Sequence, residues 1–108
     1  MPWFLLGLAI VTEVIGTLAL KISNGFTVWL PSIIVVLGYG FSFWFLSLSL
    51  KVLQVGVAYA IWAGIGTALI AIAGVIIFKE PLNILKVVSI TLIVLGVAGL
   101  HWAQNSSV

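Results

Sequence analysis

The sequence contains no cysteine, no arginine and no aspartate, and only 6% of its 108 residues carry a charge. Without cysteine there is no disulfide framework, no thiolate metal ligand and no cysteine nucleophile. Soluble domains are about 25% charged, because polar side chains must cover their surface. This composition therefore excludes an ordinary soluble domain and a disordered chain. Four lysines against two glutamates give a net charge of +2, which is no basic patch for nucleic acid.

Apolar residues make up 64% of the chain and indicate an integral membrane protein. A bilayer core about 30 Å thick is crossed by about 20 apolar helical residues. Polar residues interrupt the apolar sequence at Lys21–Thr27, which holds an Asn-Gly turn signal, at Lys51–Gly56 and at Phe78–Asn83. In the last interruption Pro81 is expected to end a helix and Asn83 to cap the next one. We expect an all-α, multi-pass membrane protein with one transmembrane domain over residues 1–108, whose four spans cover residues 3–21, 28–50, 55–77 and 84–103.

Glu13 differs from the other five charged residues, which all lie at span ends. It lies about ten residues into the first span, roughly 15 Å deep at 1.5 Å per residue, near the bilayer midplane. A central charge costs at least about 2.5–3.5 kcal/mol on insertion scales, and intramembrane acids typically mark ion pathways. Lys21 is too far along the helix to be its partner, and desolvation disfavours the charged carboxylate. We therefore expect a proton and a cationic substrate to compete for Glu13; the alternative is a permanently protonated, structural glutamic acid.

Small and aromatic residues at helical spacing predict a pocket around this acid. On the third span, Tyr59, Trp62 and Ala63 share a face, and aromatic π faces attract desolvated cations. On the second span, Trp44 lies off the face that carries the other candidates, which weakens its assignment. The alternative interpretation is helix packing through small residues and aromatic core filling. The candidate pocket residues are Ala9, Ile10, Gly16, Thr17, Tyr39, Ser42, Phe43, Trp44, Tyr59, Trp62 and Ala63.

Two further groups of residues point to helix geometry and helix contact. Gly64 and Gly66, within one turn, predict a bend or swivel point in the third span. Ser89, Ile93 and Gly96, spaced by four and three, predict a contact stripe between helices. His101 is interpreted as an interfacial residue rather than a titrating relay. The sequence offers no nucleophile–base arrangement, no metal-ligand cluster and no phosphate-binding loop, so we expect neither an enzyme nor a metal or cofactor site.

Four segments resemble the small multidrug resistance family of bacterial transporters over nearly the whole chain. They are EVIGTLALK at 13–21, SNGFT at 23–27, FSFWFL at 41–46 and GVAYAIWAGIG at 56–66. The resemblance implies an antiparallel homodimer with eight helices in the bacterial inner membrane, driven by the proton gradient without a cofactor. The two copies of Glu13 would line one shared site, open to one side at a time. It also implies that Tyr39, Ser42, Tyr59 and Trp62 line that site, with Thr17 as a small polar neighbour, and that the fourth helix holds the dimer together.

Two branches of this family export different cations: one exports drug cations and the other guanidinium ions. Gly16 helps to assign this chain to one of them. The guanidinium branch typically carries Trp at this position, whereas Gly16 followed by Thr17 is similar to the drug branch. The FKEPL segment at 78–82 is more similar to the guanidinium branch. Ala63 replaces a common Ser or Thr, and Ser89 stands where drug-branch members often have Gly.

We therefore expect a proton-coupled antiporter that exports lipophilic quaternary ammonium and aromatic drug cations by alternating access. Three alternatives remain: a guanidinium exporter, one subunit of a paired heteromeric exporter, and a non-transporting membrane scaffold.

The lysine distribution predicts the topology. With four spans, Lys51 lies on one side of the membrane and Lys21, Lys79 and Lys86 lie on the other. Orientation follows the Lys/Arg bias of short loops, and a bias of one against three is weak. We expect the chain to insert both ways up, so that one sequence supplies both halves of an antiparallel dimer.

Overall fold

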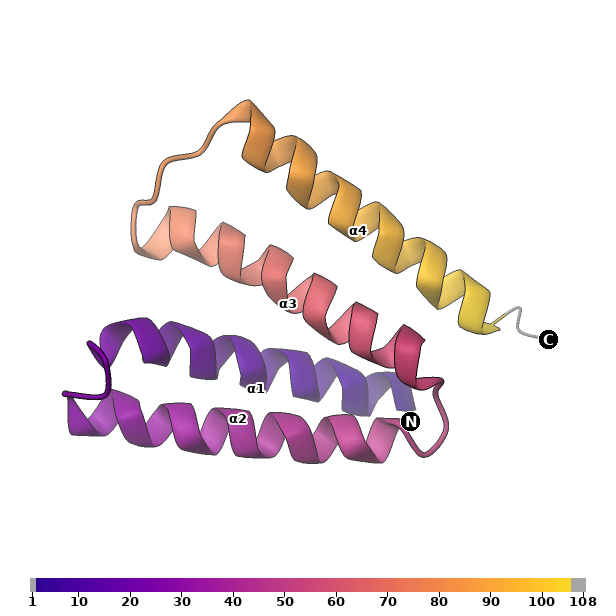
Figure 1. Cartoon of the computed structure of the whole chain (residues 1–108), viewed down its shortest axis with the longest axis horizontal. Helices are drawn as coiled ribbons and strands as arrows, with labels where there is room; N and C mark the ends of the chain where they lie inside the picture. Colours follow the sequence, from indigo (N-terminus) through magenta and orange to yellow (C-terminus); the bar gives the residue numbers. More distant parts are fainter. Residues whose placement is uncertain (1, 106–108) are drawn as a thin grey trace. The chain divides into compact units, whose positions relative to one another are not determined.

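A computed structural model describes residues 2–105 and contains four α-helices over that stretch, with no β-strand in it (Figure 1). Each helix is long and apolar enough to cross a membrane, with mean hydropathy between 1.7 and 2.3. The four predicted spans are confirmed, and every helix end lies within two residues of its predicted position. The helices are α1 (Pro2–Ile22), α2 (Trp29–Ser49), α3 (Val55–Ile77) and α4 (Ile84–Asn105).

The helices form two compact units, Met1–Leu53 and Gln54–Val108. In the first unit α1 packs against α2, and in the second unit α3 packs against α4. Each unit is therefore an antiparallel helical hairpin with a short connection.

The first unit is held together by a very close approach of two helix backbones. A Cβ atom on Gly38 would lie 2.9 Å from the carbonyl oxygen of Thr12 and 3.0 Å from the Cα of Gly16. The Ser42 hydroxyl donates to the carbonyl oxygen of Ala9 at 2.6 Å. Small residues at a membrane helix contact allow this proximity. The residues buried on the two helices are Leu6, Ala9, Ile10, Gly16 and Ala19 on α1 and Val35, Gly38, Ser42, Leu46 and Ser49 on α2.

The turn between α1 and α2 uses the predicted Asn-Gly signal. Asn24, Gly25 and Phe26 all have positive φ, at 49°, 69° and 66°. Asn and Gly adopt this left-handed region at low cost. The buried Ser23 hydroxyl donates to the carbonyl oxygen of Leu20 at 2.7 Å and accepts the backbone N–H of Phe26 at 3.1 Å. These bonds satisfy polar backbone groups that the end of α1 would otherwise leave open.

In the second unit α4 lies on α3 along one narrow stripe. A Cβ atom on Gly64 would lie 2.8 Å from Cγ2 of Val97 and 3.4 Å from Cγ2 of Ile93. No residue of α4 from Ile84 to Gln104 is fully buried. The helix α3 is continuous through Gly64 and Gly66, so Gly64 provides a helix contact here, and the swivel at these glycines stays a prediction.

The start of α4 is capped as the sequence indicates. The Asn83 side-chain oxygen Oδ1 accepts the backbone N–H of Lys86 at 2.9 Å. This is the bond pattern of an N-cap asparagine, and it confirms the predicted cap. At the other end of the unit, the Gln104 side-chain oxygen accepts the backbone N–H of Gln54 at 3.0 Å, which ties the end of α4 to the start of α3.

Candidate functional site

The candidate site is built around Glu13, which is half-buried on α1. Thr17 lies one helical turn further on and therefore shares its face. The Thr17 hydroxyl Oγ1 donates to Oε2 of Glu13 at 3.4 Å. The carboxylate therefore has a hydroxyl neighbour on its own helix, as the sequence predicted from spacing.

A second hydroxyl extends this contact onto α2. Oγ1 of Thr17 and the phenolic oxygen of Tyr39 lie 2.6 Å apart. A hydroxyl carries only one proton, and an ionised carboxylate can only accept. When Thr17 donates to Glu13, Tyr39 must therefore donate to Thr17. The three groups form a directed chain from Tyr39 through Thr17 to Glu13.

The Tyr39 ring packs directly against Gly16. A Cβ atom on Gly16 would lie 3.1 Å from Cδ1 and 3.2 Å from Cε1 of Tyr39. Such distances are closer than ordinary van der Waals contact, so any larger residue displaces the ring. The absence of a side chain at Gly16 thus sets the place of the Tyr39 hydroxyl.

Ala9 and Ser42 lie in the contact between α1 and α2, and Ile10 is buried on α1. Ser42 and Ala9 are fully buried, and the bond from Ser42 to the Ala9 carbonyl joins the two helices. Within this hairpin they agree with the alternative interpretation, in which small residues pack the helices together. Their role as pocket residues stays a prediction.

Phe43 and Trp44 lie on the exposed side of α2, with 58% and 55% of their surfaces accessible. The Trp44 ring contacts Phe45, with centroids 5.4 Å apart, and Phe41, with centroids 6.4 Å apart. Trp44 also lines a shallow hollow of about 300 Å³ over Gly40. The sequence placed Phe43 on one face with Tyr39 and Ser42, but Phe43 is as exposed as Trp44 whereas Ser42 is fully buried. The pocket roles of Phe43 and Trp44 stay predictions.

In the second unit the structure brings Tyr59 and Trp62 together. Their ring centroids are 5.5 Å apart and the planes meet at 63°, an edge-to-face arrangement. Tyr59 is 57% exposed and Trp62 is 9% exposed, and Ala63 beside them is half-buried. Tyr59 and Trp62 therefore share a face, as helical spacing predicted, and the role of Tyr59 and Trp62 in binding a ligand stays a prediction.

The three residues of the contact stripe predicted on α4 have different surroundings in the structure. Ile93 and Ser89 line a groove beside α3 of the same chain, whereas a Cβ atom on Gly96 would have no neighbour within 4 Å. The contact of these residues with a second chain stays a prediction, as does the interfacial role of His101. Within residues 2–105, no group of three His, Cys, Asp or Glu side chains is arranged to hold a metal ion.

Sequence reasoning did not identify Gly38 as part of the site. Its close approach to Thr12 and Gly16 sets the distance between the helices that carry Thr17 and Tyr39. The available signal was the Gly-Tyr-Gly segment at 38–40, since glycine flanking a candidate site residue can mark a close backbone approach.

Comparison with known proteins agrees with the resemblance seen in the sequence. Residues 1–93 match the Small Multidrug Resistance protein family. The chain is 44% identical over 108 residues to "Uncharacterized membrane protein YvaE" of Bacillus subtilis, covering 100% of this chain and 91% of that protein. It is 48% identical over 105 residues to the quaternary ammonium compound-resistance protein QacF of Klebsiella aerogenes, covering 97% and 96% of the two chains. It is 50% identical over 92 residues to the multidrug resistance protein EbrB of Bacillus licheniformis, covering 85% and 77%.

Proposed function

This chain belongs to the small multidrug resistance family, and on that premise we propose that it is a proton-coupled antiporter of lipophilic cations. Its substrates are quaternary ammonium and aromatic drug cations, which it exports across the bacterial inner membrane. The relatives named as quaternary ammonium compound-resistance and multidrug resistance proteins support this substrate class. The chain is a transporter and not an enzyme.

The proposal rests on Glu13 and the hydroxyl chain that ends on it. In the ionised state Glu13 accepts from Thr17, and Thr17 accepts from Tyr39. A bound organic cation then supplies the counter-charge that a carboxylate requires in a medium of low dielectric constant. In the protonated state Glu13 itself can donate to Thr17, and the Thr17 hydroxyl is then available to donate to Tyr39. Proton and cation are therefore alternative occupants of one site.

This competition is sufficient for exchange. Protonated Glu13 releases its proton on the side of low proton concentration and binds a cation there. The loaded protein then opens to the other side, where protons displace the cation from the carboxylate. Because protons and the cation compete for the same carboxylate site, proton entry drives cation export.

The assembly that supports this cycle is an antiparallel homodimer with two copies of Glu13 in one site. Residues of α4 from Ile84 to Gln104 are exposed or half-buried in the single chain, although this helix is apolar enough to cross a membrane. We assign its uncovered surface to lipid and to the second chain. In an antiparallel dimer the inward-open and outward-open forms are alike, with the two chains exchanging shapes. Pairing with a related but different chain is the alternative assembly.

Gly16 supports the proposal that the substrates are drug cations rather than guanidinium ions. Because Gly16 has no side chain, the Tyr39 ring occupies the space beside it, and the hydroxyl chain supplies the hydrogen bonds at Glu13. An aromatic residue at this position would displace the Tyr39 ring and narrow the site. A site without that added side chain suits bulky apolar cations that donate no hydrogen bonds. Guanidinium export is the alternative function. Transport of drug cations and of guanidinium, compared directly, distinguishes the two.

Transport by purified protein in liposomes tests the proposal. We expect tetrapropylammonium to evoke proton release from the wild type and from Glu13→Asp, and none from Glu13→Gln, which keeps the shape and removes the titration. Proton release evoked equally by tetrapropylammonium and guanidinium would contradict the drug-cation assignment. Cation-driven proton release that survives Glu13→Gln would refute the exchange mechanism.

Thr17 offers a matched pair of variants for the hydroxyl chain. Thr17→Ser keeps the hydroxyl, whereas Thr17→Val keeps the shape and removes it. A hydrogen bond to a charged group contributes about 1.5–3 kcal/mol, so Thr17→Val should weaken cation affinity about tenfold or more and change its pH dependence. Thr17→Ser should stay close to the wild type. Equal behaviour of the two variants would show that the hydroxyl has no part in the exchange.

A further inference from the structure

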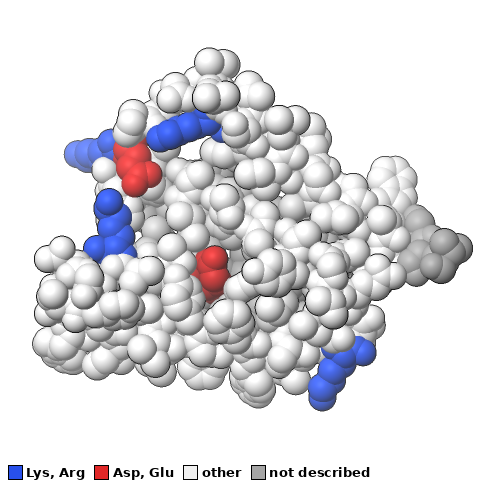
Figure 2. Space-filling view, viewed as in Figure 1, with Lys and Arg blue, Asp and Glu red and all other residues white. Residues whose placement is uncertain are grey.

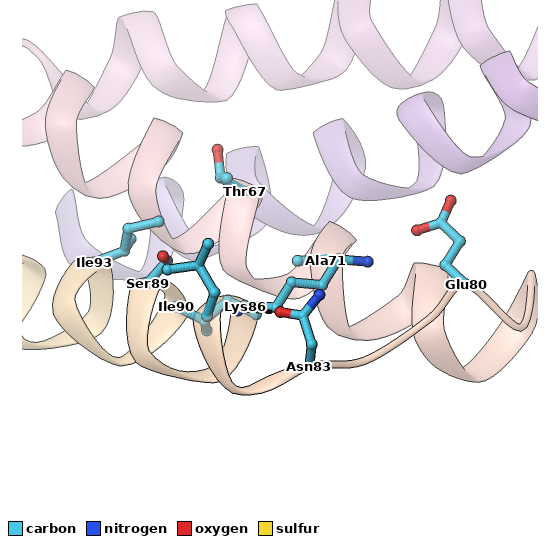
Figure 3. Close-up of a pocket in the computed structure, with 9 residues that line it drawn as sticks. Thr67, Ala71, Glu80, Asn83, Lys86, Ser89, Ile90 and Ile93 are labelled. Carbon is cyan, nitrogen blue, oxygen red and sulfur yellow. Dashed lines mark hydrogen bonds between the residues drawn. The ribbon is translucent and has the colours of Figure 1, made fainter.

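The second unit contains a groove that the transport site does not use. It runs beside α3 and α4 and under their connection, with a volume of about 520 Å³ (Figure 3). Figure 3 shows Thr67 and Ala71 on α3, Ser89, Ile90 and Ile93 on α4, and Glu80 at the loop end. The volume lies within the range of ordinary small-molecule sites.

The loop end of this groove carries charges of both signs. Glu80 and Lys86 both line it, and Figure 2 shows lysine and acidic side chains gathered over the α3–α4 connection. The ammonium group of Lys86 donates to the carbonyl oxygen of Pro81. An ammonium group has three donors, so Lys86 is oriented by one bond and keeps two for a ligand.

Gly74 determines where the Glu80 carboxylate lies. A Cβ atom on Gly74 would overlap Oε1 of Glu80, so the carboxylate occupies the space that a side chain would fill. The backbone N–H of Glu80 donates to the Gly74 carbonyl oxygen at 3.1 Å. Lys79 has a positive φ of 56°, which turns the chain back over the end of α3. The carboxylate is therefore held at the mouth of the groove.

The wall of the groove becomes apolar away from this mouth. Lys86 is the third residue of α4, whereas Ile90 and Ile93 lie about 6 and 10 Å further along at 1.5 Å per residue. In a helix that crosses a bilayer from this end, the charged groups are expected at the depth of the lipid headgroups and the isoleucines at the depth of the upper acyl chains. A ligand that fits must have a polar head with both charges and an apolar tail.

We propose that this groove binds one phospholipid with an ethanolamine headgroup. Its phosphate accepts from the Lys86 ammonium, and its primary ammonium donates to the Glu80 carboxylate. Ile90, which lies outside the stripe predicted to contact the second chain, contacts the start of one acyl chain. Choline headgroups have no N–H to donate to Glu80, and an anionic glycerol headgroup places no positive charge beside that carboxylate.

Native mass spectrometry of the purified full-length protein tests this site. The protein is mixed with phosphatidylethanolamine, phosphatidylcholine and phosphatidylglycerol that carry identical acyl chains. A charge-assisted hydrogen bond is stronger than a neutral one, so we expect the wild type to retain the ethanolamine lipid about tenfold over the choline lipid. Glu80→Gln should bring that ratio close to one, and Lys86→Met should lower retention of both.

Lys79→Met is the matched control, because it removes one positive charge from the same connection at a residue outside the groove lining. It should keep the wild-type ratio. Gly74→Ala keeps every charge but places a methyl group where the Glu80 carboxylate lies, and it should lower the ratio as Glu80→Gln does. Equal retention of the two lipids by the wild type would overturn the proposal. An unchanged ratio in both Glu80→Gln and Gly74→Ala would overturn it as well.

Discussion

Gly38→Ala is the substitution for which the structure predicts the clearest change in stability. The new methyl group would lie 2.9 Å from the carbonyl oxygen of Thr12 and 3.0 Å from the Cα of Gly16. Both neighbours are backbone atoms, which cannot rotate away as a side chain can. Relief of the clash therefore requires α1 and α2 to separate along their contact.

The control lies two residues away on the same helix. A Cβ atom on Gly40 would have no neighbour within 4 Å, so Gly40→Ala changes only the backbone freedom of the chain. Alanine is better than glycine in a helix by about 0.5–1 kcal/mol, and both variants gain this amount. Overpacking costs about 1–3 kcal/mol. The free energy of unfolding should thus be about 1–3 kcal/mol lower for Gly38→Ala than for Gly40→Ala.

Unfolding in mixed micelles, titrated with sodium dodecyl sulfate and followed by tryptophan fluorescence, measures this difference. The same separation of the helices should lengthen the 2.6 Å contact between Tyr39 and Thr17. We therefore expect weaker binding of tetrapropylammonium by Gly38→Ala and unchanged binding by Gly40→Ala. Equal stability of the two variants would refute the close approach of α1 and α2 and the role assigned to Gly38.

Three further changes test the site and the assembly. Gly16→Trp should displace the Tyr39 ring, which lies against Gly16, and slow liposome transport of bulky aromatic cations more than that of tetramethylammonium; an equal loss for all sizes would indicate misfolding. Trp62→Ala removes the ring that contacts Tyr59 edge-to-face and should reduce affinity for aromatic cations most, by about two- to thirtyfold for a lost cation–π contact; an equal effect on alkyl cations would exclude ring stacking. Ser107→Cys, at a position outside the described residues, supplies the only thiol of the chain and should react with impermeant maleimide from both sides of the membrane; labelling from one side in a sample that transports would refute dual topology.

The sequence by itself determined the four spans, the turn at Asn24–Gly25, the helix cap at Asn83 and the identity of the central acid. These features depend on local physics: about 20 apolar residues cross a bilayer wherever they occur, and Asn24–Gly25 and Asn83 act on their immediate backbone. The contact between Thr17 and Glu13 follows from spacing within one helix. The grouping of Tyr59 with Trp62 follows from the same periodicity.

Only the tertiary structure decided how the helices are rotated and how closely they approach. Apolar residues surround each span so evenly that periodicity alone does not show which face meets which neighbour. The seating of Tyr39 on Gly16, the contact of Gly38 with the backbone of α1 and the bond from Ser42 to Ala9 join residues far apart in the sequence. The fold of Glu80 onto Gly74 likewise depends on the left-handed backbone at Lys79. Such contacts depend on shape complementarity between whole elements, which no local pattern of residues encodes.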